Sequence, residues 1–436
     1  MGLRSPSEAI QLPILEELKA LKWHTLECEL VTPMYGGGVD AATVDLKMPI
    51  RVSAIKGQLR FWWRLLAKNK KDDTWNFNGN LKRIRDAEFA LWGGQGDDDG
   101  GRASQVFLKV TQPKVTHHDL VEYTEYLDAN PNNKKLSYVL FPASNAEDKV
   151  SNPHTHKLLN AEKAKFKLSF SLSNTLKNQE KMTQQIVETL RWWANFGGLG
   201  ARSRKGLGAI HVSESLDYPQ IATPLSKDEI NSANCSVVFK GKSANPLGQL
   251  YSGIQKLSEF RQGSELGRNK GSTKSGGRSR WPEPDAIRSI TGEYLILGEK
   301  NHKPIHEAKN IFPRAMFGLP IIVKFKNDEK DDNKNWIKLP DKPEPKKTTI
   351  EPVNADRLAS PLFIRPFYLG KNGKGEKEWA SCALVTPYEH IKNMNVSLGR
   401  NETYPVWRSD TAQHIRPIQD QQGTDPLDAF LKYFAK

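Results

Sequence analysis

The segment "GLGARSRKGLG", residues 198–208, has a glycine pair on each side of five residues, three of which are basic. Glycine allows the backbone to adopt positive φ and lets a second backbone approach closely. Successive backbone N–H groups in such turns bind anions, and arginine donates two hydrogen bonds to one phosphate. We therefore predict a phosphate-binding loop made of Gly198, Gly200, Arg202, Ser203, Arg204, Lys205, Gly206 and Gly208. The alternative is a tight turn whose cations are only solvated.

This segment does not fit a nucleotide-binding P-loop. That motif requires a strand followed by G-x-x-x-x-G-K-[ST]. Here Lys205 precedes Gly206, and Leu207 follows. The preceding residues, 182–196, also have the periodicity of a helix. We therefore expect the segment to connect a helix to a strand over residues 208–215.

The neighbouring segments predict the fold of the N-terminal half. Helical spacing of apolar residues indicates a helix over 54–68. Alternating patterns predict strands over residues 23–33 and 165–173, and a further strand is expected over 103–113. The order strand–helix–strand–strand–helix–strand is typical of a ferredoxin-like domain, in which two helices cover a four-stranded antiparallel sheet. Residues 112–165 are expected to be an insertion with a short strand at 136–142.

A second unit is expected after residue 225. Strands are predicted over 234–242, 316–327, 358–368 and 378–387, and helices over 246–260 and 425–436. The expected fold class is α+β, with two tandem ferredoxin-like (RRM-like) domains that carry loop insertions. The predicted domains span residues 1–225 and 226–436. A second insertion is expected at 327–350.

Composition favours a polyanionic partner. The chain of 436 residues has a net charge of +14, and nucleic acid is the commonest partner of such a protein. The sequence has no run of about 18 apolar residues, so no membrane-spanning helix is expected. Cys28, Cys235 and Cys382 lie far apart, which indicates neither a disulfide framework nor a zinc site. We expect a cytoplasmic protein without metal or cofactor.

Two further segments are strongly basic. Residues 51–71 have seven Lys or Arg and no acid, and Lys56, Arg60 and Arg64 recur every four residues along the predicted helix. Such a stripe can follow a phosphate backbone, although a solvated helix face is the alternative. Residues 261–280 have six Lys or Arg and one Glu. We predict that Arg268, Arg278, Arg280 and Trp281 clamp and stack on a single strand; the alternative is a linker.

At these residues the sequence resembles the RAMP superfamily of CRISPR RNA-binding proteins. "GLGARSRKGLG" matches the superfamily's signature G-h-G-x5-G-h-G. Four further motifs resemble one branch, subunit 1 of the type III-B Cmr effector complex: "TPMYGGGVD" (32–40), "PIRVSAIKGQLRFWWR" (49–64), "GRSRWPEPDAIR" (277–288) and "RLASPLFIRP" (357–366).

The resemblance implies a non-catalytic RNA-binding subunit of a ribonucleoprotein used in antiviral defence. Such a subunit would cap the end that holds the 3′ part of the guide RNA and would help to capture target RNA. The implied partners are guide (CRISPR) RNA, target single-stranded RNA and the other Cmr subunits. The motif match also implies that Gly36, Gly37 and Gly38 form a loop near RNA or a neighbouring subunit.

Two alternatives remain open at this point. Some RAMP proteins cleave guide precursors with a histidine as general base, and the candidates here are His24, His117, His118, His154 and His156. Asp40, next to the glycine triplet, could in principle assist cleavage of target RNA. The other alternative is a structural capping subunit that has little direct contact with RNA.

Overall fold

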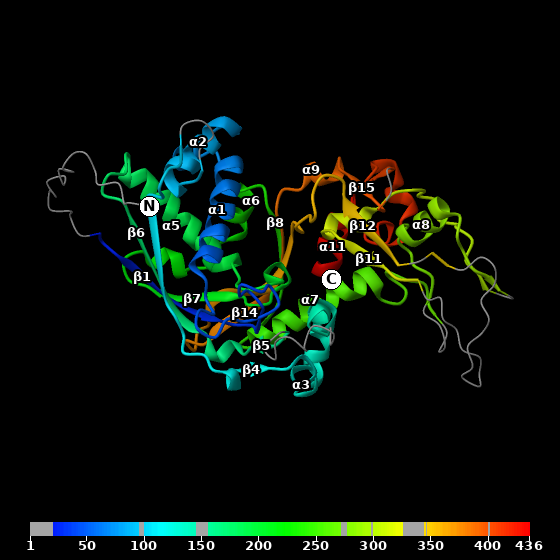
Figure 1. Cartoon of the computed structure of the whole chain (residues 1–436), viewed down its shortest axis with the longest axis horizontal. Helices are drawn as coiled ribbons and strands as arrows, with labels where there is room; N and C mark the ends of the chain where they lie inside the picture. Colours follow the sequence, from blue (N-terminus) through cyan, green and yellow to red (C-terminus); the bar gives the residue numbers. More distant parts are fainter. Residues whose placement is uncertain are drawn as a thin grey trace, which may run out of the picture.

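A computed structural model describes residues 21–95, 100–144, 156–271, 277–297, 300–325, 344–345, 347–399 and 402–436 (Figure 1). The N-terminal half contains an antiparallel sheet in the order β3-β6-β1-β7. Its strands are β1 (His24–Leu30), β3 (Val106–Thr111), β6 (Lys165–Leu172) and β7 (Ile210–Ser215). This is the strand order of a ferredoxin-like domain, as the sequence predicted.

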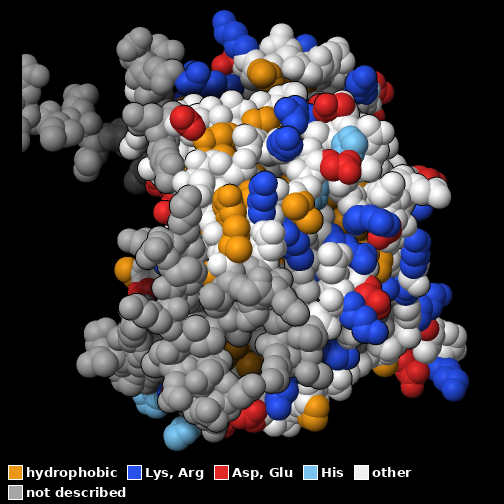
Figure 2. Space-filling view, turned by 90° about the vertical axis from the view of Figure 1, so that its right-hand side faces the viewer, with side chains coloured by type: hydrophobic (Ala, Val, Ile, Leu, Met, Phe, Trp, Pro, Cys, Tyr) orange, Lys and Arg blue, Asp and Glu red, His pale blue; other side chains and the backbone are white. Residues whose placement is uncertain are grey.

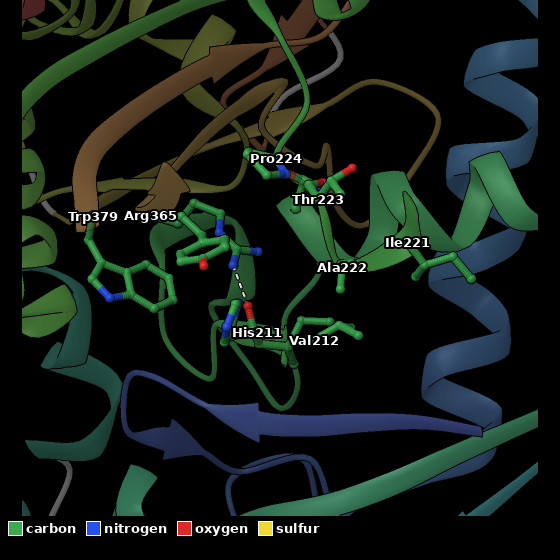
Figure 3. A pocket seen from close by; sticks show the side chains of 12 residues that line it. His211, Val212, Ile221, Ala222, Thr223, Pro224, Arg365 and Trp379 are labelled. Carbon is green, nitrogen blue, oxygen red and sulfur yellow. Dashed lines mark hydrogen bonds between the residues drawn. The ribbon is translucent and has the colours of Figure 1, made fainter. Parts of the chain in front are cut away.

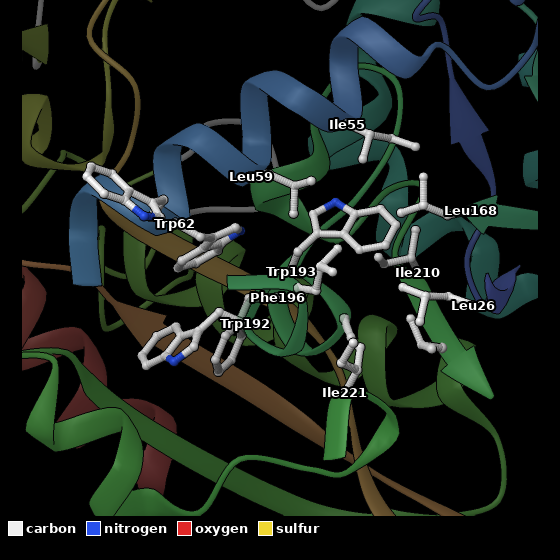
Figure 4. Close-up of a cluster of buried hydrophobic side chains, with 14 of the residues drawn as sticks. Leu26, Ile55, Leu59, Trp62, Leu168, Trp192, Trp193, Phe196, Ile210 and Ile221 are labelled. Atoms are coloured by element: carbon white, nitrogen blue, oxygen red, sulfur yellow. The ribbon is translucent and has the colours of Figure 1, made fainter. Parts of the chain in front are cut away.

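Two helices cover one face of this sheet, namely α1 (Val52–Asn69) and α5 (Gln179–Phe196). The apolar side chains that recur every three or four residues in both helices are buried. Trp62 and Trp193 are fully buried, and Figure 4 shows both within a cluster of apolar side chains. The tryptophans therefore belong to the core.

The second half contains a three-stranded antiparallel sheet in the order β13-β14-β8. Its strands are β8 (Ser236–Ser243), β13 (Leu362–Lys371) and β14 (Lys377–Val385). Helices α7 (Pro246–Gln262) and α11 (Pro426–Ala435) belong to the same unit. Chain order and strand order match the first three strands and both helices of a ferredoxin-like domain, and the described residues of this sheet include no fourth strand.

The two halves share their cores. Along β13, Phe363 and Phe367 join the core of the first half, whereas Leu362 and Ile364 join that of the second. The ring centroids of Trp62 and Phe363 lie 5.4 Å apart. Helices α1 and α5 are therefore packed between the two sheets, and α7 and α11 cover the far face of the second sheet. The predicted boundary at residue 225 stays a prediction.

One predicted strand was wrong, and another is shorter than predicted. Residues 136–142 form the end of η3 (Pro131–Leu136), α4 (Ser137–Leu140) and the start of η4 (Phe141–Ser144). Leu136, Val139 and Leu140 are buried there at helical spacing, a pattern that a short apolar run does not distinguish from a strand. The strand predicted over 316–327 is shorter in the structure: the described residues of this range, 316–325, contain the end of η9 (Pro313–Phe317) and β11 (Ile321–Val323).

Smaller elements complete the chain. A four-stranded sheet has the order β11-β12-β15-β16, a three-stranded one β2-β5-β4, and a hairpin pairs β10 with β9. The remaining elements are β2 (Met34–Tyr35), η1 (Asp73–Trp75), α2 (Leu81–Trp92), η2 (His117–Asp119), β4 (Leu120–Val121), α3 (Tyr123–Asp128), β5 (Leu158–Leu159), η6 (Ala161–Lys163), η7 (Ser203–Lys205), η8 (Pro219–Ala222), α6 (Lys227–Ser232), α8 (Glu283–Thr291), β9 (Ile296–Leu297), β10 (Lys300–Asn301), β12 (Thr348–Pro352), α9 (Glu389–Lys392), β15 (Asn395–Ser397), β16 (Thr403–Pro405), η10 (Ser409–His414) and α10 (Arg416–Gln419). Among the helices that the structure describes, none is both long enough and apolar enough to cross a membrane.

Candidate nucleic-acid interface

The glycine loop, residues 198–208, connects α5 to β7 as the sequence predicted. It closes on itself, because the amide of Leu199 donates to the carbonyl of Gly208 at 2.8 Å. Gly200, Gly206 and Gly208 have φ of +75°, +79° and +58°, and Arg202 has +61°. Three of the four glycines therefore occupy the backbone region that only glycine adopts without strain.

Close backbone contacts explain the glycine spacing. A Cβ atom on Gly200 would lie 2.5 Å from the carbonyl oxygen of Tyr35, and one on Gly37 would lie 2.8 Å from the Cα of Gly200. The amide of Ala201 donates to the same carbonyl of Tyr35 at 2.7 Å. The triplet Gly36–Gly38 thus packs against the glycine loop. Its expected contact with RNA or a neighbouring subunit stays a prediction.

The other end of the loop packs against the second half of the chain. A Cβ on Gly206 would lie 2.6 Å from the carbonyl oxygen of Ile364 in β13. The Thr32 hydroxyl donates to the carbonyl of Gly206 at 2.6 Å and accepts from the amide of Ala209 at 2.8 Å. A Cβ on Gly198 would also come within 2.9 Å of the Ser203 side chain. The neighbours that require glycine are therefore protein backbone and side chains.

The three cations of the loop point to different places. Arg202 is exposed, with its guanidinium 4.9 Å from the ring centroid of Phe141. Arg204 points inward between the rings of Phe61 and Phe363, at 4.9 and 4.8 Å, and donates to the carbonyl of Ser360. Burial lowers the pKa of Arg204 to about 10. Arg204 therefore holds the loop to the second half, and its contact with RNA stays a prediction.

Lys205 is partly buried at the same junction. Its ammonium donates to the Ser360 hydroxyl at 3.2 Å. Burial, and next the charge of Arg261, lower the pKa of Lys205 to about 7, with smaller effects from Arg202 and Arg204. A lysine with this pKa is only partly protonated at neutral pH, and a nearby anion favours its charged form.

Arg365 in β13 is a residue that the sequence analysis missed. It is 3% exposed, and its guanidinium donates to the carbonyl of Gly197 and, at 2.6 Å, to that of Ile210. These two carbonyls lie just before and just after the glycine loop. Figure 3 shows Arg365 close to Trp379 and His211. The sequence feature that could have identified Arg365 is the single arginine within the apolar run "PLFIRPFY" (361–368).

His211 follows Ile210 and lines a small cavity with Arg365. Its ring centroid lies 4.5 Å from that of Tyr368 and 5.0 Å from that of Trp379. Burial, with a smaller effect from Lys377 and Arg365, lowers the pKa of His211 to about 3. This histidine is therefore neutral at physiological pH.

The RAMP superfamily model matches residues 27–211, which run from β1 into β7 and include the glycine loop. This part of the chain, residues 27–211, is similar to the RAMP superfamily, and we call it the RAMP domain. Among solved structures, the chain is similar to Cmr1 from Pyrococcus furiosus, with 16% identity over 88% of this chain and 92% of that one, at a TM-score of 0.44. It is also similar to a chain of type III-B Cmr-beta bound to cognate target RNA, with 12% identity over 96% and 100% at a TM-score of 0.48. A comparison with curated proteins found no significant match.

The basic stripe of the RAMP domain is partly neutralised. Arg60 and Arg64 both pair with the buried carboxylate of Glu88 in α2, at 2.7 and 2.6 Å. The sequence analysis noted no acid within 51–71, but α2 supplies one. Lys56 makes no ion pair with any described residue, and burial and the charge of Arg60 lower its pKa. The contact of this stripe with RNA stays a prediction, and Lys56 is the member whose charge no described acid neutralises.

The second basic loop is held by contacts within the chain. Arg278 contacts both carboxylate oxygens of Asp285 at 2.8 Å, and Arg280 donates to the side-chain oxygen of Asn269 at 2.9 Å. Arg268 is exposed. Trp281 is only 1% exposed and packs on Phe260. A base therefore cannot stack on Trp281 in this conformation, because the core of the second half occupies its ring.

The candidate histidines are placed at separate sites. The ring of His24 contacts Asp217 at 2.7 Å, and the buried His156 contacts the hydroxyl of Tyr35 at 2.9 Å. His117 and His118 lie on η2, and His154 falls outside the described residues. Within the described part of the chain, no three His, Cys, Asp or Glu side chains are grouped to hold a metal.

Asp40 takes part in a local turn. Its carboxylate accepts hydrogen bonds from the Thr43 hydroxyl at 2.5 Å and from the Ala42 amide at 3.1 Å. These bonds hold its pKa below the usual range. Asp40 is therefore ionised and engaged in the structure of its own loop.

Proposed function

We propose that the chain is a non-catalytic RNA-binding subunit of a type III-B (Cmr) effector complex. In this proposal it caps the end that holds the 3′ part of the guide RNA and helps to capture target RNA. The observation that carries the proposal is the glycine loop of the RAMP domain, which presents the exposed Arg202 and the half-buried Lys205 without a carboxylate partner among the described residues. The net charge of +14 favours the same partner.

Binding of RNA by the full chain tests the central claim. Labelled single-stranded RNA is incubated with the purified protein across a salt series, with and without EDTA. We expect intact RNA and a log–log salt slope of about −0.7 for each phosphate contacted. A cut product would instead support a guide-processing endoribonuclease. Little salt-dependent affinity for RNA would support a structural subunit that has little direct contact with RNA.

The capping position requires an assembly experiment. The complex is reconstituted from the other Cmr subunits and guide RNA, with and without this chain, and a 3′→5′ exonuclease is added. We expect this chain to protect the 3′ part of the guide. Equal trimming in both samples would contradict the capping position while leaving RNA binding by the chain itself intact.

A further inference from the structure

A cavity that the glycine loop does not line lies between the insertion at 112–165 and helix α7. Its volume is about 320 Å³, and it is open to solvent. Residues of η3 and its N-cap line one side, and residues of α7 and its N-cap line the other. Figure 1 shows this part of the insertion next to α7. We call the cavity the amide pocket, because carboxamides are the commonest side chains in its lining.

Buried contacts hold the two sides of the amide pocket together. The hydroxyl of Tyr251 in α7 donates to the side-chain oxygen of Asn133 in η3, and both residues are buried. The NH₂ group of Asn133 donates in turn to the carbonyl of Tyr126 at 2.5 Å. Leu136 of η3 and Leu250 of α7 belong to the same apolar core. The pocket is therefore formed in the free chain, and a ligand that binds there need not order its walls.

The lining of the amide pocket is polar but almost uncharged. Asn130 and Asn132 come from the insertion, and Asn245 and Gln255 come from the second half. Among the described lining residues, Lys135 is the only one with a charge. On the face shown in Figure 2, in contrast, Lys and Arg side chains are interspersed with Asp and Glu. A lining with one cation and no carboxylate favours a neutral, hydrogen-bonding group as the ligand, with at most one negative charge beside it.

Several polar groups of the lining are available to a ligand. The side chains of Asn132, Lys135 and Ser252 make no hydrogen bond or ion pair with any described residue. The carbonyl oxygens of Asn130 and Asn245 accept backbone N–H groups at 2.9 and 3.1 Å, which fixes both side chains. Their NH₂ groups have no partner among the described residues. The pocket therefore offers oriented donors together with groups that can both donate and accept.

A nucleobase is the ligand that suits this lining. Gln255 supplies an acceptor, because its NH₂ group already donates to Glu259 at 2.8 Å and its carbonyl oxygen has no described partner. The edges of bases present donors and acceptors side by side, and Asn and Gln pair with an adenine edge through two hydrogen bonds. Proteins that read single-stranded RNA commonly do so through hydrogen bonds to an unstacked base. Sites for small ligands hold about 300–1,000 Å³, so the volume of the amide pocket suits one nucleotide better than a long protein segment.

We infer that the amide pocket binds the base of one unstacked nucleotide of single-stranded RNA. The inference rests on the proposed RNA-binding function and adds a base-reading site outside the glycine loop. The carboxamides and the Ser252 hydroxyl contact the edge of the base, and Lys135 contacts the adjoining phosphate. Such a site gives the chain a sequence preference at one position, which contacts with phosphates alone do not give.

The test measures the affinity of the full chain for four labelled RNA oligonucleotides of equal length: oligo(A), oligo(C), oligo(U) and alternating G and U. We expect the affinities of the best and the worst oligonucleotide to differ on the order of tenfold. Ser252→Leu fills the pocket from an exposed position of α7 and should remove most of this difference. Lys135→Gln should weaken binding of all four and make the log–log salt slope shallower by about 0.7. The matched control is Lys134→Gln, because Lys134 is the exposed neighbour, does not line the pocket and lies 3.9 Å from Asp128; it should retain the wild-type slope.

Thermal unfolding establishes that each variant is folded. If Ser252→Leu does not fold, Asn132→Leu replaces it, because Asn132 is exposed on the other side of the pocket, and the same loss of preference is expected. Equal affinity of the wild-type chain for all four oligonucleotides would overturn the inference while the proposed function stands. A folded Ser252→Leu variant that keeps the wild-type preference would also overturn it. If that variant instead loses its association with the other Cmr subunits, the pocket is a contact with protein. A wild-type chain that does not bind RNA would overturn both the inference and the proposed function.

Discussion

Replacing Arg365 by methionine should separate the glycine loop from the second half. Methionine keeps much of the aliphatic length but removes the donors that reach the carbonyls of Gly197 and Ile210. A hydrogen bond from a charged donor contributes about 1.5 to 3 kcal/mol. Because removal of the guanidinium also removes the cost of burying it, we take the lower value for each carbonyl. The expected loss in the free energy of unfolding is about 3 kcal/mol.

Urea unfolding followed by tryptophan fluorescence measures this loss, since Trp62 and Trp379 are buried near the junction. Arg365→Lys should recover little of the stability, because one ammonium does not reproduce the planar fork that spans two carbonyls. Arg416→Met is the control: Arg416 is exposed, and we expect a change within about 0.5 kcal/mol. Hydrogen exchange adds a local readout, because the amides of Leu199 and Gly208 should exchange faster in Arg365→Met. If Arg365→Met unfolds at the wild-type urea concentration and keeps slow loop exchange, Arg365 does not secure the loop.

Three further predictions concern the glycine loop. Gly206→Ala should lower the free energy of unfolding by about 2 kcal/mol, because φ is +79° and the new Cβ would meet the carbonyl of Ile364. Thermal unfolding measures this loss. Gly373→Ala is the control and should be nearly neutral, because a Cβ at Gly373 meets nothing within 4 Å. Arg202→Ala should weaken RNA binding without changing stability. Arg204→Ala should destabilise the fold, because the Arg204 guanidinium fills the space between Phe61 and Phe363. Equal melting temperatures for the two variants would contradict these different roles of Arg202 and Arg204. RNA affinity should depend on pH through Lys205, which faces Arg202, Arg204, Arg261 and the Ser360 hydroxyl. The pKa of Lys205 in the free chain is about 7, and a bound phosphate raises it. Binding therefore takes up a proton, and RNA affinity falls by up to about tenfold per pH unit above pH 7. Lys205→Met should flatten the dependence of affinity on pH, and an equally steep dependence in this variant would show that Lys205 is not the titrating group.

Local patterns predicted the main elements of the N-terminal half. The apolar spacing of α1 and α5 and the alternation of the sequence in β1 and β6 were sufficient to predict these elements. Residues 136–142 were mispredicted because their short apolar run fits both helix and strand. Contact with the second core decided for helix, which buries Leu136 and Leu140 on one side.

The glycine loop shows where prediction of a site from sequence ends. Four glycines in eleven residues predicted positive φ and close backbone approach, and both are present. The sequence analysis expected RNA as the close neighbour, whereas the structure puts Tyr35, Gly37 and Ile364 there. It also expected Arg204 and Trp281 to contact RNA. In the structure Arg204 packs between Phe61 and Phe363 and Trp281 is buried, and their contacts with RNA stay predictions.

The sequence by itself determined the order of the elements of the N-terminal half, the ferredoxin-like topology of the RAMP domain and the position of its glycine loop. The elements follow from the local periodicity of apolar residues, and the topology was predicted from the order of the elements. Only the tertiary structure decided which cations pair with acids of the same chain and which have no acidic partner among the described residues. Glu88 pairs with Arg60 and Arg64, whereas Lys205 has Arg261 as a charged neighbour and no acid among the described residues. Such pairings depend on distances between residues remote in sequence, and a charge count along the chain contains no information about those distances.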